Sequence, residues 1–253
     1  MKFAVISDVH IKKAGDNAED LLLKFLRNPD VRSSDVILLL GDIFDLMIGP
    51  LPQYFARFQP YFDELKTLIS EGKRICYVEG NHDFHIKKLY QTFFKYNPAL
   101  DSSLFSIQPF FIFNNNEKIY YFAHGDDIEL NNPNYKRFKS LVNSAPLTLF
   151  ANYLMPHFLI KGIGEYSSEK SRKRNNKRYS TESDLTPVKN NFRYSVEEFY
   201  KTLKFDVIVL GHSHVKDLYI SENNFVYANN GYAQHTKTYI SIENGNISFK
   251  DIY

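Results

Sequence analysis

Seven side chains in this sequence have the chemistry to bind metal ions together. They are two carboxylates, four imidazoles and one amide: Asp8, His10, Asp42, Asn81, His124, His212 and His214. Mixed nitrogen and oxygen donors suit manganese, iron or zinc, whereas an all-oxygen set would favour magnesium or calcium. Seven ligands are too many for one tetrahedral ion. They suit two ions that lie about 3.5–4 Å apart and share a carboxylate.

The spacing of four of these residues favours convergence. Asp8 and His10 are separated by one residue, and so are His212 and His214. On an extended segment, residues two apart point to the same face. Each pair is therefore expected to direct both side chains at one ion. A single aspartate after a strand is more often a helix cap or turn residue. Here five strand ends carry possible ligands, and this joint occurrence favours a metal site.

The segment Gly80-Asn81-His82-Asp83 adds groups that could act on a substrate. We expect Gly80 to let the chain turn sharply at a strand end, so that Asn81 and His82 project from the rim of a sheet. His82 could then donate a proton to a leaving oxygen or stabilise it, with Asp83 orienting the ring. The predicted catalytic residues are therefore Asn81, His82 and Asp83.

The predicted metal ligands follow strands that alternate with helices along the chain. The apolar runs that predict strands are 2–7, 35–40, 74–78, 118–123 and 205–210, and the helical patterns lie at about 18–26, 53–71 and 195–203. Short connections favour an α/β layer architecture with substantially parallel strands, whose ligands gather beyond the carboxyl ends. We expect short strands near 104–122 and a β-meander after residue 214 to complete a second sheet.

Composition narrows the class of protein. The chain has 253 residues, of which 43% are hydrophobic and 16% aromatic, enough for one large domain over residues 1–253. A net charge of +2 gives no electrostatic reason to expect a nucleic-acid partner. The single cysteine suits a reducing compartment. An early polar residue argues against a signal peptide, and no apolar stretch is long enough for a membrane span. The expected location is cytoplasmic.

The stretch at about 131–193 differs in character from the rest. It shows no strand pattern, and it combines an amphipathic segment, an apolar segment at 147–163 and a basic run at 170–178. We interpret it as a largely helical insertion. An apolar stretch beside basic residues suits a ligand with acyl tails and a diphosphate, or an anionic bilayer surface. The plainer alternative is a helical hairpin packed on the core with a solvated basic face.

Five short blocks resemble the signatures of the calcineurin-like metallophosphoesterases. They are Asp8-x-His10, Gly41-Asp42, Gly80-Asn81-His82-Asp83, His124-Gly125 and Gly211-His212-x-His214. The resemblance implies a four-layer α/β-β/α sandwich with a helical cap insertion and a dinuclear metal site. It assigns Asp8, His10 and His214 to one ion and Asn81, His124 and His212 to the other, with Asp42 bridging. Because each ligand position is filled, a metal-free protein-binding scaffold is disfavoured.

The insertion resembles that of one branch, the UDP-2,3-diacylglucosamine pyrophosphatases of lipid A synthesis. The branch implies a manganese hydrolase, with iron or zinc as alternative metals. Its reaction releases UMP and 2,3-diacylglucosamine 1-phosphate, after water that is activated by the ions attacks the uridine-side phosphorus. It also implies a nucleotide-sugar lipid substrate and peripheral contact with the inner membrane, and leaves the oligomeric state open. The implied substrate contacts are Asn81, His82, Asn132, Tyr135, Ser171, Asn175, Lys177, Arg178 and His212.

Two departures from that branch leave an alternative open. The branch has arginine where this chain has His82, and an acidic residue near the position of Asn132. Histidine is the residue of the wider superfamily. The alternative is therefore a metallophosphoesterase of a sister group that acts on another nucleotide, a phosphodiester or a protein phosphate.

Overall fold

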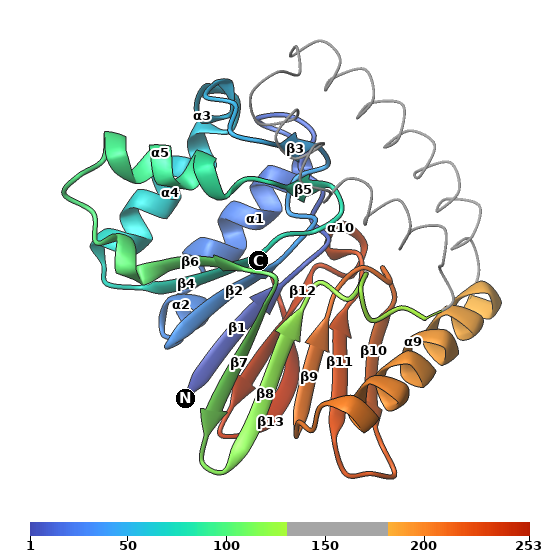
Figure 1. The fold of residues 1–253 in the computed structure, drawn as a ribbon. Coiled ribbons are helices and arrows are strands. Elements are labelled where there is room, and N and C mark those ends of the chain that lie inside the picture. Colours follow the sequence, from blue (N-terminus) through green and yellow to red (C-terminus); the bar gives the residue numbers. More distant parts are fainter. Residues whose placement is uncertain (131–181) are drawn as a thin grey trace, which may run out of the picture.

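Two β-sheets lie face to face, and helices cover the outer face of each in the computed structural model (Figure 1), which describes residues 1–130 and 182–253. The first sheet contains, in spatial order, β13 (Asn246–Asp251), β12 (Thr238–Glu243), β1 (Lys2–Ile6), β2 (Val36–Leu40), β4 (Arg74–Val78) and β6 (Phe105–Gln108). The second contains β10 (Lys216–Ile220), β11 (Val226–Asn230), β9 (Val207–Leu210), β8 (Lys118–Ala123) and β7 (Phe110–Asn115). Strands β3 (Met47–Ile48) and β5 (Asp83–Phe84) form a separate, two-stranded parallel sheet. The predicted four-layer α/β-β/α architecture is confirmed.

Strand β1 shows why its sequence is a continuous apolar run. Phe3 and Val5 pack against the second sheet, while Ala4 and Ile6 pack against the helices on the other side. Side chains alternate between the two faces of a strand, and both faces are buried in this layered arrangement. A central strand of such a sheet is therefore apolar at every position.

Helices cover the outer faces of both sheets. The helices that follow the strands of the first sheet are α1 (Asn17–Arg27), α2 (Pro29–Arg32), α3 (Gln53–Arg57), α4 (Gln59–Ser70) and α5 (Lys87–Tyr96); the others are η1 (Ser102–Leu104), α9 (Glu182–Thr202) and α10 (Ala233–Thr236). Helices α1, α4 and α5 share a core with the first sheet, and α9 shares one with the second. The remaining core fills the space between the sheets.

Two helices differ from the sequence prediction. The helix expected over 53–71 is divided at Phe58 into α3 and α4, because Pro60 lies in the first turn of α4 and has no N–H for a preceding carbonyl. The helix expected from residue 195 begins at Glu182 and includes Pro187. Helix α9 therefore continues without a break across residue 193, where the sequence indicated the end of the insertion.

The sequence predicted that the strands after residue 214 all belong to the second sheet, and this prediction is wrong. Strands β10 and β11 belong to the second sheet, but β12 pairs antiparallel with β1, with Lys2 opposite Glu243, and β13 extends the first sheet. The expected meander is therefore shared between the two layers. Within the part of the chain that the structure describes, no helix combines the length and the apolar character needed to cross a bilayer.

Candidate metal centre

All seven predicted ligands follow the carboxyl ends of strands, and these ends lie at one edge of the paired sheets. Strands β1, β2 and β4 are parallel neighbours, as are β8 and β9, so their carboxyl ends point the same way. The loops after β1 and β2 are joined directly. The backbone N–H groups of Val9 and His10 each donate to the carbonyl of Asp42 at 2.9 Å. The sheet topology thus brings ligands together that are far apart in the sequence.

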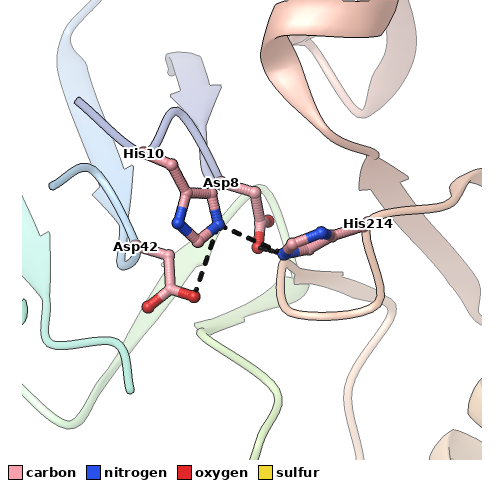
Figure 2. A group of neighbouring side chains, drawn as sticks. All are labelled: Asp8, His10, Asp42 and His214. Atoms are coloured by element: carbon pink, nitrogen blue, oxygen red, sulfur yellow. Dashed lines mark hydrogen bonds and ion pairs between the residues drawn. The ribbon is translucent and has the colours of Figure 1, made fainter. Parts of the chain in front are cut away.

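Figure 2 shows the first group of ligands, in which the side chains of Asp8, His10, Asp42 and His214 point toward one another. His10 Nε2 lies 3.2 Å from His214 Nε2 and 3.6 Å from Asp42 Oδ2. His214 Nε2 lies 3.3 Å from Asp8 Oδ1. One donor atom from each of the four residues falls within a 4.8 Å span, which fits a single ion.

The second group forms beside the first. His124 Nε2 and His212 Nδ1 lie 3.2 and 2.9 Å from Asn81 Oδ1. His124 Nε2 is also 3.6 Å from Oδ1 of Asp42. Asp42 therefore faces the first group with Oδ2 and the second with Oδ1, as a carboxylate shared by two ions requires. The structure brings all seven predicted metal ligands together.

The backbone at these ligands is not extended, which corrects the reasoning from the sequence. The φ angles of Asp8, His10, Asp42, His212 and His214 are all positive, between 53° and 65°. The left-handed region costs a non-glycine residue roughly 1 kcal/mol or more, so the surrounding contacts must hold these residues in place. Such a run of unusual backbone at one site is typical of a functional centre.

The sequence suggested that Gly80 permits a sharp turn. The structure shows instead that this position needs glycine because there is no space for a side chain. Its φ lies outside the left-handed region, but an added Cβ would lie 2.3 Å from the backbone nitrogen and Oδ1 of Asp42. That distance is far shorter than any allowed contact with a fixed backbone. The loop after β4 can therefore approach Asp42 closely only with glycine at this position.

The predicted role of Asp83 is wrong. Its carboxylate accepts hydrogen bonds from the backbone N–H groups of Asp42, Ile43, Phe44 and Gly80 and from the hydroxyl of Tyr77, at 2.6–3.2 Å. It does not orient His82, whose Nδ1 lies 2.9 Å from the carbonyl oxygen of Asp45. Burial, followed by the charge of Asp42, raises the pKa of Asp83 to about 7. Asp83 fixes the loop that carries Asp42.

Buried polar side chains that the sequence reasoning missed connect the two sheets at this edge. Asn230 Oδ1 accepts a hydrogen bond from Ser7 N at 3.1 Å, and Ser7 Oγ lies 2.5 Å from Asp8 Oδ2. Asn229 Nδ2 donates to the carbonyl of Gly211 at 2.7 Å. The signal available in the sequence was two adjacent asparagines directly after an apolar strand. These contacts hold the loops after β1 and β9 against each other.

The pKa values of the acidic and histidine side chains in the centre depend on the charges of their neighbours. Burial raises the pKa of Asp8, but the hydrogen bond and charge of His214 outweigh it, so the pKa lies below its ordinary value. Burial lowers the pKa of His124, yet the charges of Asp42, Asp126 and Asp8 raise it to about 9. Positive charge is therefore favoured at His124, whereas burial holds the pKa of His10 below its ordinary value. Divalent cations supply such charge, and the nitrogen and oxygen donors fit them.

Three of the histidines that are predicted to be ligands each have an acceptor behind the ring. The Nδ1 atoms of His10 and His124 lie 3.7 Å from Asp45 Oδ1 and 2.8 Å from the carbonyl of Leu40, respectively. His212 Nε2 lies 3.5 Å from Glu129 Oε2. Such outer acceptors fix the tautomer and the orientation of a ligand histidine. Asp45 and Glu129 were not predicted from the sequence, because only the fold brings them to these rings.

The predicted substrate contacts are only partly covered by the described residues. Asn81, His82 and His212 lie in the centre, with the rings of His10 and His82 at 4.9 Å between centroids. The others lie outside the described residues, and so does the insertion up to residue 181: Asn132, Tyr135, Ser171, Asn175, Lys177 and Arg178.

Known proteins resemble this chain in sequence. The family model of the calcineurin-like phosphoesterases matches residues 1–216. The UDP-2,3-diacylglucosamine hydrolase of Wigglesworthia glossinidia brevipalpis is 28% identical over 225 residues, which cover 88% of this chain and 83% of that protein. The protein of the same name from Tolumonas auensis is 24% identical, over 86% of this chain and 83% of its own. A solved archaeal phosphodiesterase covers 99% of both chains at 13% identity, with a TM-score of 0.48.

Proposed function

The chain belongs to the calcineurin-like phosphoesterase family, and from that membership we propose that it hydrolyses UDP-2,3-diacylglucosamine to UMP and 2,3-diacylglucosamine 1-phosphate. As a member it is a metal-dependent hydrolase. The observation that carries the proposal is the convergence of two donor groups on Asp42, beside the ring of His82. The substrate is supported by the relatives that bear its name.

The residues of the chain have separable roles in this reaction. Asp8, His10 and His214 would hold one divalent ion, and Asn81, His124 and His212 the other, with Asp42 between them. When bound, two such ions, which we propose to be Mn²⁺, make water a nucleophile at neutral pH and neutralise charge on the phosphate. His82 Nδ1 lies 2.9 Å from the carbonyl of Asp45, to which it would donate its N–H. In its doubly protonated form the ring would then donate the second proton, from Nε2, to the leaving oxygen.

The lipid part of the substrate is assigned to the insertion. We expect its apolar segment at 147–163 to hold the acyl chains, and Asn132, Tyr135, Ser171, Asn175, Lys177 and Arg178 to contact the sugar and the diphosphate. The same basic residues would favour an anionic bilayer surface. We therefore propose a cytoplasmic protein in peripheral contact with the inner membrane.

The substrate can be tested directly with purified protein and Mn²⁺. We expect release of UMP from UDP-2,3-diacylglucosamine, measured by chromatography, and much slower turnover of UDP-N-acetylglucosamine, which lacks the two acyl chains. In the alternative function, bis(p-nitrophenyl) phosphate would be hydrolysed faster than either sugar nucleotide. The presence of His82, where the branch has arginine, is the observation that favours this alternative. Rapid turnover of the diester without release of UMP would refute the lipid substrate.

Replacing His82 by glutamine is expected to lower kcat by about 10²–10⁴-fold, the usual contribution of a general acid. The glutamine cannot supply a proton, but metal binding should persist because His82 is not among the proposed ligands of either ion; it shares only a third candidate group, with His10 and Asp45. Calorimetric titration with Mn²⁺ would confirm that binding is retained. A substrate whose leaving group needs no protonation should recover most of the lost rate. An unchanged kcat for the lipid substrate would contradict the proposed role.

A further inference from the structure

Glu129 links a metal ligand to the helix that follows the insertion. Gly125, next to the ligand His124, accepts hydrogen bonds from the N–H groups of Ile128 and Glu129 through its carbonyl, both at 3.1 Å. The Glu129 side chain at the end of this turn is 11% exposed. Oε2 of Glu129 lies 3.5 Å from His212 Nε2. Oε1 accepts a hydrogen bond from Asn191 Nδ2 on α9 at 3.3 Å.

Helix α9 itself is fixed to the second sheet. Arg193 donates two hydrogen bonds to the carboxylate of Asp217, at 2.7 and 2.8 Å. One turn further along, Glu197 accepts from Tyr219 and Ser221, at 3.0 and 2.6 Å. The part of α9 that contacts Glu129 is therefore held in place by charge-assisted hydrogen bonds.

His212 would hold an ion through Nδ1. Nδ1 lies 2.9 Å from Asn81 Oδ1, another ligand of the same group. The ring must therefore present an unprotonated Nδ1 to the ion and keep its proton on Nε2. A carboxylate facing Nε2 stabilises that tautomer and raises the basicity of the ligand. In the part of the chain that the structure describes, Glu129 provides this carboxylate.

We propose that Glu129 is a positioning residue that acts through His212 and sets the affinity of the ion held by Asn81, His124 and His212. The proposal rests on the metal centre of the proposed function, but not on the lipid substrate. It also implies that the first turn after His124, which carries Glu129, influences this ion. The other ion, held by Asp8, His10 and His214, has Asp45 as its outer carboxylate and should be independent of Glu129.

The test is calorimetric titration of the metal-free protein with MnCl₂. Loss of such an outer partner typically weakens metal binding about 10–100-fold, so Glu129→Ala should raise the Kd of one ion by that factor and leave the other within about twofold. Glu129→Gln keeps the shape and an acceptor, so a smaller increase in the same Kd is expected. If Glu129→Ala does not fold, the glutamine variant decides.

Two further variants separate positioning from a structural role. Asn191→Ala removes the contact with Oε1 but leaves Glu129 Oε2 facing His212, so both metal affinities should stay within about twofold of the wild type. In a His212→Ala background, Glu129→Ala should cause no additional change in the affinity of the remaining ions, because its effect passes through His212. Glu198→Gln, whose partner is Lys201 on the surface of α9, is the matched control.

Each outcome decides the proposal. Selective weakening of one ion, abolished in the His212→Ala background, supports it. Unchanged affinities in Glu129→Ala, an equal loss at both ions, or a full effect that persists without His212 would each overturn it. Because the titration contains no phosphate ester, failure of the lipid substrate would leave this result unaffected. Electron paramagnetic resonance of the two-Mn²⁺ protein gives a second readout, since spin coupling disappears when one ion is lost.

Discussion

Asp42→Asn is expected to reduce turnover by about 10³-fold or more, since a loss of several kcal/mol of transition-state charge stabilisation corresponds to that factor. Asp42 faces one ligand group with Oδ2 and the other with Oδ1, at 3.6 Å from His10 and His124 respectively. An asparagine has only one oxygen and no charge. The variant should therefore bind one Mn²⁺ tightly where the wild type binds two, as measured by titration of the metal-free protein.

The same variant should remain folded. Asp42 is 1% exposed, and its Oδ1 accepts a hydrogen bond from His82 N at 2.9 Å, which an asparagine oxygen can also accept. The charge that is lost repels Asp8 and Asp83 but attracts the neighbouring histidines, so the net effect on stability should be small. The matched control is Asp63→Asn, on the exposed surface of α4 beside Lys66, which should behave as the wild type. Full turnover in Asp42→Asn would show that this carboxylate does not bridge two ions.

Asp83→Ala is expected to destabilise the protein by at least about 3 kcal/mol, because several buried donors lose their acceptor and each costs about 1–3 kcal/mol. The donors are the backbone N–H groups of Asp42, Ile43, Phe44 and Gly80 and the hydroxyl of Tyr77. Urea unfolding of the metal-free protein measures the change in free energy. Because three of these donors, the N–H groups of Asp42, Ile43 and Phe44, belong to the loop of Asp42, metal affinity should fall as well.

The comparison variant for Asp83 is asparagine. It keeps one oxygen for some of the five donors but turns an amide group toward the rest, so its stability should lie between those of wild type and Asp83→Ala. Asp63→Ala, at the surface, should change the free energy of unfolding by about 0.5 kcal/mol or less. An Asp83→Ala variant as stable as the wild type would show that the hydrogen bonds to this carboxylate contribute little.

Asp42→Asn and Asp83→Ala separate two functions of this edge of the sheets, which are metal binding and stabilisation of the loops. Asp42→Asn should lose an ion without losing stability, whereas Asp83→Ala should lose stability first and metal affinity as a consequence. The sequence predicted Asp42 as a bridging ligand and Asp83 as the residue that orients His82. Only the structure shows that Asp83 instead accepts hydrogen bonds from the loop of Asp42.

The sequence by itself determined the chemistry of the centre. The ligand types and their positions after apolar runs were sufficient, because residue type sets donor chemistry and the carboxyl ends of parallel strands meet at one edge. The continuous apolar runs in β1 and β2 likewise indicated strands buried on both faces. These properties are local, so a short segment carries them without help from the rest of the chain.

The tertiary structure decided what depends on distant contacts. It placed β12 beside β1, and it brought Asp45 and Glu129 behind the rings of His10 and His212. It also set the left-handed backbone of the ligands, which no local preference favours and which only surrounding hydrogen bonds maintain. The physical reason is that the partner of a buried charge or an edge strand is chosen by packing across the whole molecule, whereas donor chemistry belongs to each residue alone.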